Sequence, residues 1–126
     1  MPEQANTEII RKKLRQRREA NQKELLKELE RITTAAKALG VQKIILFGSA
    51  AWGNPGVISD LDLLIIWDTP LDFLSRTTEL YNYLQPYVAV DMLVYTPDEV
   101  ERMVDRPFIR KILDEGRVLY DAKCEN

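Results

Sequence analysis

The order of helical and β-rich segments predicts an α/β (α+β) domain, in which helices flank a small mixed β-sheet and a long helix stands at the N-terminus. Residues from about 7 to 39 contain no Gly or Pro and are dense in helix-forming residues. Three short apolar runs rich in β-forming residues follow, and segments with helical spacing lie among them. At 126 residues the chain is long enough for one hydrophobic core and too short for two.

The composition limits both the location of the chain and its chemistry. Hydrophobic residues make up 45% and charged residues 30%, as in ordinary globular proteins. No apolar stretch is long enough to span a membrane and the N-terminus is not signal-like, so we expect a cytoplasmic protein with no membrane contact. The single Cys124 argues against disulfides and thiolate metal sites. The absence of histidine excludes an imidazole base and a Ser-His-Asp triad, so any catalysis must use carboxylates.

The long N-terminal segment carries an apolar stripe only in its second half. There, apolar residues recur at intervals of three or four: Leu25, Leu29, Ile32, Ala36 and Leu39. Gly40 then supplies a helix cap. Apolar positions are sparse before Leu25, so we expect the first two or three turns to project beyond the body. The chain is accordingly divided into an N-terminal helical extension (1–24) and a globular domain (25–126).

Charge is distributed unevenly along the chain. Residues 1–38 hold 10 Lys or Arg against 6 Asp or Glu, while residues 39–126 hold 8 against 14. A basic arm on an acidic body is consistent with nucleic-acid contact or with a solvated helix held by ion pairs. We favour the solvated helix, because no aromatic residue is interleaved with the arm's charges to stack on bases. The sequence leaves a homo-oligomer open.

The remaining elements follow from apolar runs and turn residues. Strands are predicted at 41–47, 61–67 and 88–95, and the second should be covered on both faces because it is apolar at nearly every position. A helix is expected to run from about 71 to 84, with Thr69 or Asp72 as its cap. A short helix is then expected to begin at Thr96-Pro97, with the proline in its first turn. A further helix should run from 106 or 107 to 115, and a short last strand should cover 118–120.

Gly48-Ser49, ten further residues and then Asp60-Leu61-Asp62 form the most informative pattern in the chain, and Asp91 opens the third apolar run. Each aspartate alone could be a turn residue. Asp60 and Asp62 are two residues apart, however, so on a strand they share one face about 7 Å apart. Clustered carboxylates repel each other unless a cation lies between them. The set therefore predicts a metal site.

The Gly48-Ser49 turn adds a candidate phosphate-binding element to the predicted metal site. A glycine at a strand-to-helix turn lets backbone N–H groups approach an anion closely, and Ser49 can donate its hydroxyl. Gly-Ser alone is a common turn, but a phosphate-binding turn beside a carboxylate pair is what nucleotide chemistry requires. Mg²⁺ prefers such oxygen ligands, and a two-ion site is expected. Asp91 would lie nearest the attacking hydroxyl, as a ligand of the second ion or as a proton acceptor.

Residues 47–49, 59–64 and 90–93 together resemble the minimal nucleotidyltransferase (MNT) branch of the polymerase-β-like nucleotidyltransferase superfamily. The resemblance covers the chain from about Leu25 to Tyr120, so it makes 25–126 a nucleotidyltransferase domain. It implies the polymerase-β-like fold, ATP as the nucleotide substrate, and Mg²⁺. The roles that it implies are nucleotide binding by Gly48, Ser49 and Ser59, and catalysis and metal binding by Asp60, Asp62 and Asp91.

The same resemblance implies a partner and an activity. Members of this branch are often encoded beside a small helical HEPN-domain protein, frequently a ribonuclease toxin, which they neutralise by binding it and adding AMP to a tyrosine. The leading prediction is thus Mg²⁺-dependent transfer of AMP from ATP to a hydroxyl of such a partner, as the antitoxin of a toxin-antitoxin pair. The alternative is a non-catalytic module that binds a nucleotide or neutralises its partner by covering it.

The chain departs from its relatives directly after the Gly-Ser turn. Many relatives carry arginines there, whereas this chain has Ala50-Ala51-Trp52-Gly53 and no basic residue between Lys43 and Arg76. Metal, backbone amides or groups from elsewhere would then have to neutralise a triphosphate. Trp52 could pack at the base of the nucleotide site or in the core.

Overall fold

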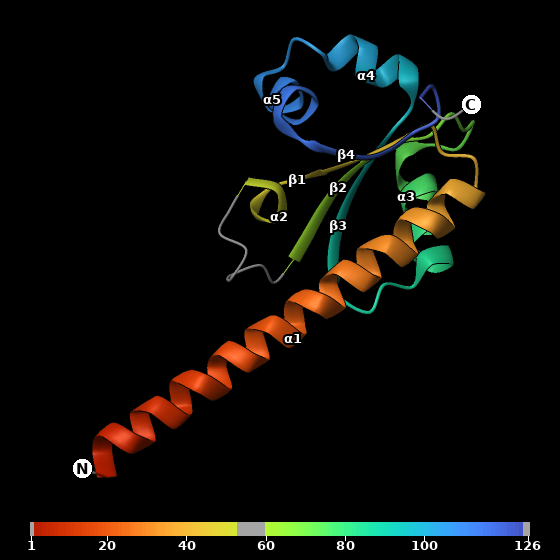
Figure 1. Cartoon of the computed structure of the whole chain (residues 1–126). Helices are drawn as coiled ribbons and strands as arrows, with labels where there is room; N and C mark the ends of the chain where they lie inside the picture. Colours follow the sequence, from red (N-terminus) through yellow and green to blue (C-terminus); the bar gives the residue numbers. More distant parts are fainter. Residues whose placement is uncertain (1, 53–59, 125–126) are drawn as a thin grey trace.

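The computed structural model describes residues 2–52 and 60–124, with side chains described from residue 6 onward. It contains the predicted elements in the predicted order (Figure 1). They are α1 (Pro2–Ala38), β1 (Lys43–Phe47), α2 (Ser49–Trp52), β2 (Asp60–Ile66), α3 (Phe73–Leu84), β3 (Ala89–Tyr95), α4 (Pro97–Met103), α5 (Pro107–Glu115) and β4 (Arg117–Asp121). The predicted α+β class with a long N-terminal helix is confirmed.

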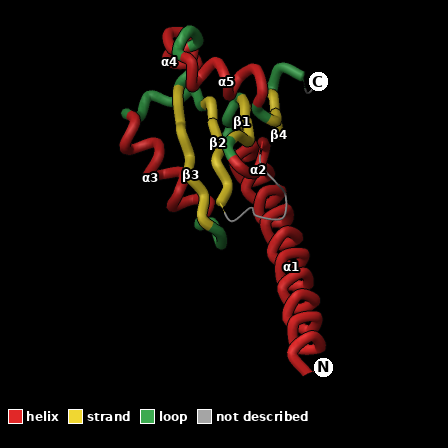
Figure 2. Tube along the Cα trace, turned by 90° about the vertical axis from the view of Figure 1, so that its left-hand side faces the viewer, coloured by secondary structure: helices red, strands yellow, loops and turns green. Residues whose placement is uncertain are grey.

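The strands form one mixed sheet in the order β3-β2-β1-β4 (Figure 2). Strand β1 runs antiparallel to both β2 and β4, whereas β2 and β3 are parallel. From its second residue onward, β2 is buried at every position except Asp62, which is half-buried. This confirms a strand covered on both faces, as its continuous apolar composition predicted.

Helices cover both faces of the sheet, and alternate strand residues supply two separate cores. Figure 1 shows α1 and α3 on one side and α4 and α5 on the other. The first core joins α1 and α3 to one set of strand residues, among them Ile32, Leu80, Ile44, Leu63 and Met92. The second lies under α4 and α5 and contains Ile45, Phe47, Leu64, Met103, Ile109 and Ile112. Successive residues of a strand point to opposite faces of the sheet, and this alternation decides which of the two cores each residue joins.

Helix α1 extends farther beyond the body than the predicted two or three turns (Figure 1). Its stripe of Leu25, Leu29, Ile32 and Ala36 is buried as expected, but residues 6–24 are exposed except for the half-buried Gln22. That segment is about 30 Å long at 1.5 Å per residue. The body cannot hold it because too few apolar residues precede Leu25 to pack against the sheet. Within residues 2–52 and 60–124, no helix has the length and apolar character of a membrane span.

Capping residues account for where the shorter helices begin. Asp72, rather than Thr69, caps α3, because its carboxylate accepts the Ser75 N–H at 2.8 Å. Thr96 and Glu99 form a capping box at α4, with Pro97 at the first helical position. The last strand, β4, is longer than the predicted 118–120 because it pairs with β1 along most of that strand's length.

A buried carboxylate fixes α1 to the connection between α3 and β3. Glu28 is 5% exposed and accepts a 3.0 Å hydrogen bond from Arg31. Glu28 also accepts the backbone N–H of Tyr87, and Arg31 donates to the carbonyl of Leu84 at 2.7 Å. This contact sets where the chain enters β3, the strand that carries Asp91.

Candidate active site

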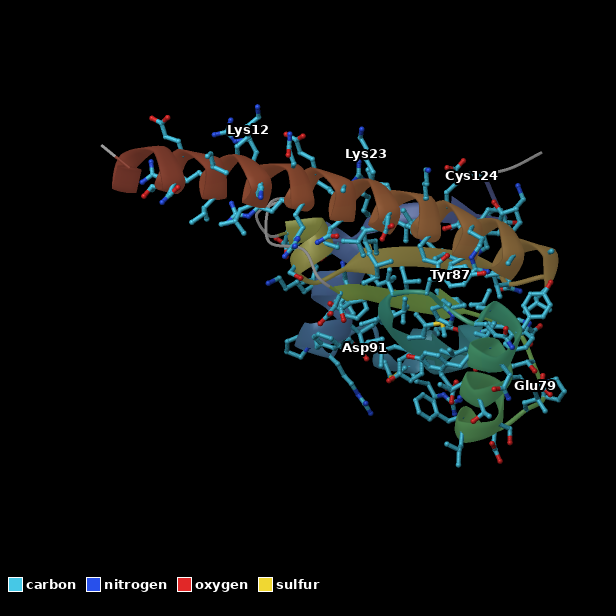
Figure 3. All side chains as sticks on the ribbon, turned by 90° about the horizontal axis from the view of Figure 1, so that it is seen from below. Lys12, Lys23, Glu79, Tyr87, Asp91 and Cys124 are labelled. Atoms are coloured by element: carbon cyan, nitrogen blue, oxygen red, sulfur yellow. The ribbon has the colours of Figure 1, made fainter. Side chains whose placement is uncertain are left out.

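Strand register places Phe47, Asp62 and Asp91 in one row across the sheet. Phe47 on β1 pairs with Asp62 on β2, and Asp62 pairs with Asp91 on β3. Directly paired residues of neighbouring strands point to the same face. Since Phe47 is buried in the core under α5, the two carboxylates also belong to the α5 face of the sheet. Figure 3 shows Asp91 on the side of the sheet opposite α1.

Asp60 lies two residues before Asp62, at the first position of β2. It therefore shares the α5 face with Asp62 and Asp91, as predicted from the spacing. Asp60 and Asp91 are exposed, and Asp62 is half-buried. The three carboxylates lie at one end of the strands, where β2 and β3 begin and β1 ends.

The Gly48 turn lies directly against the Asp62 carboxylate. Gly48 has a φ of +72°, in the left-handed region that favours glycine. A Cβ at this position would lie 2.2 Å from Oδ2 of Asp62, which is far inside van der Waals contact. Only a residue without a side chain allows the turn and the carboxylate to approach this closely. The structure thus brings the Gly48-Ser49 turn and the Asp60-Leu61-Asp62 strand of the sequence pattern into contact.

The position of Ser49 follows from this turn. The Gly48 carbonyl accepts the N–H groups of Ala51 at 3.1 Å and Trp52 at 2.8 Å, which turns the chain directly into α2. Ser49 is the first residue of that helix. Ser59, which the sequence assigned to the nucleotide, lies outside the described residues.

Asp62 experiences the charges of its neighbours. Burial is the main cause that raises the pKa of Asp62, and the Coulomb repulsion of Asp91 and then Asp60 raises it further. The ionised form of Asp62 is therefore less favourable here than in a free aspartate, and a cation beside it would offset this cost. This is the electrostatic environment expected of a site that binds positive charge.

The three carboxylates do not surround a single point. Among the described residues, no group of three or more His, Cys, Asp or Glu side chains is arranged to hold a metal ion. Mg²⁺ is typically held by one or two carboxylates together with substrate phosphates and water, so a cage of three is not required. The hard oxygen donors of Asp62 and a neighbouring aspartate, beside the Gly48 turn, fit that kind of coordination.

Tyr81 on α3 fixes the strand around Asp91, a contact that the sequence did not reveal. Its hydroxyl donates to the carbonyl of Val90 at 2.5 Å and accepts the N–H of Met92 at 3.1 Å. These two residues flank Asp91. The helical spacing in the sequence did not single out Tyr81, and the partners of its hydroxyl depend on how α3 crosses β3.

Trp52 joins α2 to α5 beside the site. Its side chain is 37% exposed, lies 6.3 Å from the Phe47 ring between centroids, and donates its indole N–H to the Glu115 carbonyl at 2.9 Å. The ammonium of Lys111 lies 4.5 Å from the centre of the Trp52 ring. Trp52 is therefore partly a packing residue, and it lies at the surface one helical turn after Ser49.

Comparison with known proteins identifies the family of the chain. The family model described as "Polymerase beta, Nucleotidyltransferase" matches residues 27–125. A Methanocaldococcus jannaschii protein named "Putative protein adenylyltransferase MJ0604" is 33% identical over 101 residues, which are 79% of this chain and 99% of that protein. No solved structure is significantly similar to the chain. Because the family match spans most of the chain and includes the Gly48 turn and all three aspartates, the chain belongs to the polymerase beta nucleotidyltransferase family, and its general activity is nucleotidyl transfer.

Proposed function

We propose that this protein transfers AMP from ATP to a hydroxyl group of a partner protein, with Mg²⁺ as cofactor. The observation that carries the proposal is the row in which Asp62 lies between the Gly48 turn and Asp91. That row combines a glycine turn at the start of a helix, which suits a phosphate, with carboxylates at the end of the sheet where β2 and β3 begin. Nucleotidyl transfer needs both parts within reach of one reacting phosphorus.

In the proposed reaction, the acceptor hydroxyl oxygen attacks the α-phosphorus of ATP. The bond between that phosphorus and the oxygen bridging to the β-phosphorus breaks, and pyrophosphate leaves with the bond's electron pair. Asp91 is exposed and close to Asp62, so it is suited to accept the proton of the attacking hydroxyl. Gly48 and Ser49 hold the phosphates, and Ser59 is assigned to the nucleotide by family resemblance alone.

Asp60, Asp62 and Asp91 are the proposed Mg²⁺ ligands, in a site for two ions completed by the phosphates. When bound, Mg²⁺ supplies positive charge that offsets the carboxylates and the developing charge of the transferred group. The raised pKa of Asp62, caused first by burial and then by Asp91 and Asp60, supports this assignment.

A protein acceptor is supported by the M. jannaschii relative, which is named as a putative protein adenylyltransferase. The resemblance to the MNT branch supports a small helical HEPN-domain toxin as that acceptor, in a cytoplasmic toxin-antitoxin pair. The chain has one compact body and no second domain that could bind an acceptor by itself within the described residues. The partner would therefore supply part of the acceptor site.

The test is to incubate the chain with its HEPN partner, ATP and Mg²⁺, and to measure AMP on the partner by mass spectrometry. We expect AMP on a hydroxyl side chain of the partner, and none with Asp60→Ala or with EDTA. The proposal would be contradicted if the partner forms a complex without gaining AMP and if Asp60→Ala neutralises the partner as well as the wild-type chain does.

A non-catalytic module that neutralises its partner by covering it is the second candidate. It is favoured by the lack of any basic residue between Lys43 and Arg76, where many relatives carry arginines. In that case inhibition of the partner would need neither ATP nor Mg²⁺. The retention of three carboxylates beside the Gly48 turn favours the enzyme.

A further inference from the structure

We propose that Lys111 of α5 binds the outer phosphates of the nucleotide and supplies the positive charge that the segment after Gly48-Ser49 lacks. The inference rests on the proposed nucleotidyl transfer. Its starting point is the electrostatic problem of the site: a triphosphate would be bound beside three carboxylates, and residues 44–75 contain no Lys or Arg. Besides Mg²⁺ and backbone amides, a basic side chain from another element of the fold can neutralise the phosphates at the turn.

Helix α5 packs on the face of the sheet that carries the three aspartates, over the end of β1. Its buried residues Ile109 and Ile112 pack in the same core as Phe47, the residue next to Gly48. Phe108 meets Phe47 edge to face, with 5.7 Å between ring centroids. Since Phe47 pairs with Asp62 across β1 and β2, α5 lies beside the carboxylate row.

Lys111 lies one helical turn after Phe108, on the side of α5 that faces α2. Its ammonium is 4.5 Å from the centre of the Trp52 ring, and Trp52 is three residues after Ser49. The indole itself is fixed by a 2.9 Å hydrogen bond to the Glu115 carbonyl. The ring thus holds the cation next to the phosphate-binding turn before any nucleotide binds.

The charge of Lys111 is available to a ligand. Its side chain is exposed and makes no ion pair with an acidic side chain of the described residues. The neighbouring Arg110, in contrast, pairs with Asp114 at 3.1 Å. A lysine ammonium on a flexible four-carbon stem can leave the ring and bind a phosphate oxygen.

The same placement indicates which phosphates Lys111 contacts. The α-phosphorus must lie near Asp62 and Asp91, because the acceptor attacks it there. The ammonium of Lys111 instead contacts Trp52 of α2, the helix that begins at Ser49, so we assign it to the β- and γ-phosphates that leave as pyrophosphate. Lys111 is accordingly a substrate-binding residue that distinguishes a triphosphate from a monophosphate.

The experiment measures the equilibrium binding of ATP and AMP to the full chain in Mg²⁺ by titration calorimetry. We expect Lys111→Ala to weaken ATP binding by about ten- to hundredfold, the range of one charge-assisted contact, and to leave AMP binding unchanged. Lys111→Arg should keep most of the ATP affinity, and Lys111→Glu should lose more than the alanine variant. Arg110→Ala is the matched control and should bind ATP as the unmodified chain does.

The outcomes separate this inference from the proposed function. If the unmodified chain binds ATP and Lys111→Ala binds it equally well, the role of Lys111 is overturned while the proposed function stands. Equal losses for ATP and AMP would also overturn it, because they would indicate a general effect on the site. An unmodified chain that binds no ATP would overturn both.

Discussion

At the scale of single residues, the site depends on one close approach, between Gly48 and the Asp62 carboxylate. The sequence alone predicts that both residues belong to the site. The spacing of Asp60 and Asp62 and the alternation of strand residues decide their shared face, because both are local properties of a strand. The direct contact with Gly48 depends on the pairing of β1 with β2, which the sequence does not specify.

The first prediction separates backbone strain from loss of that approach. Gly48→Ala and Gly40→Ala each place a side chain at a positive φ, +72° and +87° respectively, so each should cost about 1–2 kcal/mol of stability. Only the Gly48 variant also displaces Asp62, because a Cβ at Gly40 has no atom within 4 Å. We expect Gly48→Ala alone to lose ATP binding and transfer, measured alongside denaturant unfolding. Equal activity losses in both variants would contradict this.

At the scale of elements, the helices and strands were predicted well, whereas the contacts between them were not. Apolar runs and caps such as Asp72 are visible in sequence because they act within one segment. Tyr81 and Lys111 were missed because their roles arise where α3 crosses β3 and where α5 covers α2. No spacing rule connects these residues to the aspartates.

The contact between α3 and β3 gives the second prediction. Tyr81→Phe removes the hydroxyl that bonds the backbone on both sides of Asp91, so we expect a stability loss of about 1–2 kcal/mol. It should also lower the rate of transfer by about tenfold or more, since small displacements of a catalytic group are costly. Tyr83→Phe, at an exposed position of the same helix, is the control for both measurements. A Tyr81→Phe enzyme with an unchanged kcat would show that Asp91 needs no such support.

The contact between α1 and the entry to β3 predicts a dependence of stability on pH. The hydrogen bond from Arg31, followed by that from the Tyr87 N–H, lowers the pKa of Glu28, although burial acts in the opposite direction. A carboxyl with a lowered folded-state pKa stabilises the fold above its unfolded pKa, about 4.3 for Glu. This stabilisation is lost as the pH falls from that value through the lower folded-state pKa.

Glu28→Gln should therefore destabilise the chain at pH 7 by roughly 1.5–3 kcal/mol, the range for hydrogen bonds to a charged group. The difference from the unmodified chain should shrink on acidification, in denaturant unfolding measured from pH 7 to pH 3. Glu30→Gln, an exposed position on the same helix, should follow the unmodified chain throughout. Curves for Glu28→Gln that remain parallel to the unmodified chain would refute this assignment.

At the scale of the whole molecule, the structure consists of a two-core body and an exposed helical arm (Figure 1). The basic side chains of residues 11–18 make no ion pair with the described residues. The helical ion pairs that were expected to neutralise this part of the arm are therefore absent from the described structure. Among residues 6–24, no apolar side chain is buried, and Ile9, Ile10 and Leu14 are exposed.

Deleting residues 1–20 should consequently leave the body folded, with its melting temperature changed by less than about 2 °C, because no core contact is lost. ATP binding should also be unchanged, measured by calorimetry on the shortened chain. A strong, salt-dependent affinity for nucleic acid that disappears with the deletion would instead favour the nucleic-acid interpretation of the arm. A loss of the folded state would show that the arm stabilises the body.

The central claim is that Asp62, between the Gly48 turn and Asp91, binds ATP together with Mg²⁺. The most direct test is the melting temperature of the unmodified chain and of Asp62→Asn, with ATP, in the presence and absence of Mg²⁺. We predict a rise of several °C for the unmodified chain only with Mg²⁺, since ligand at about 100 times its Kd adds about 2.7 kcal/mol. Asp62→Asn should show no rise. An equal rise in Asp62→Asn, or one that does not need Mg²⁺, would contradict the claim.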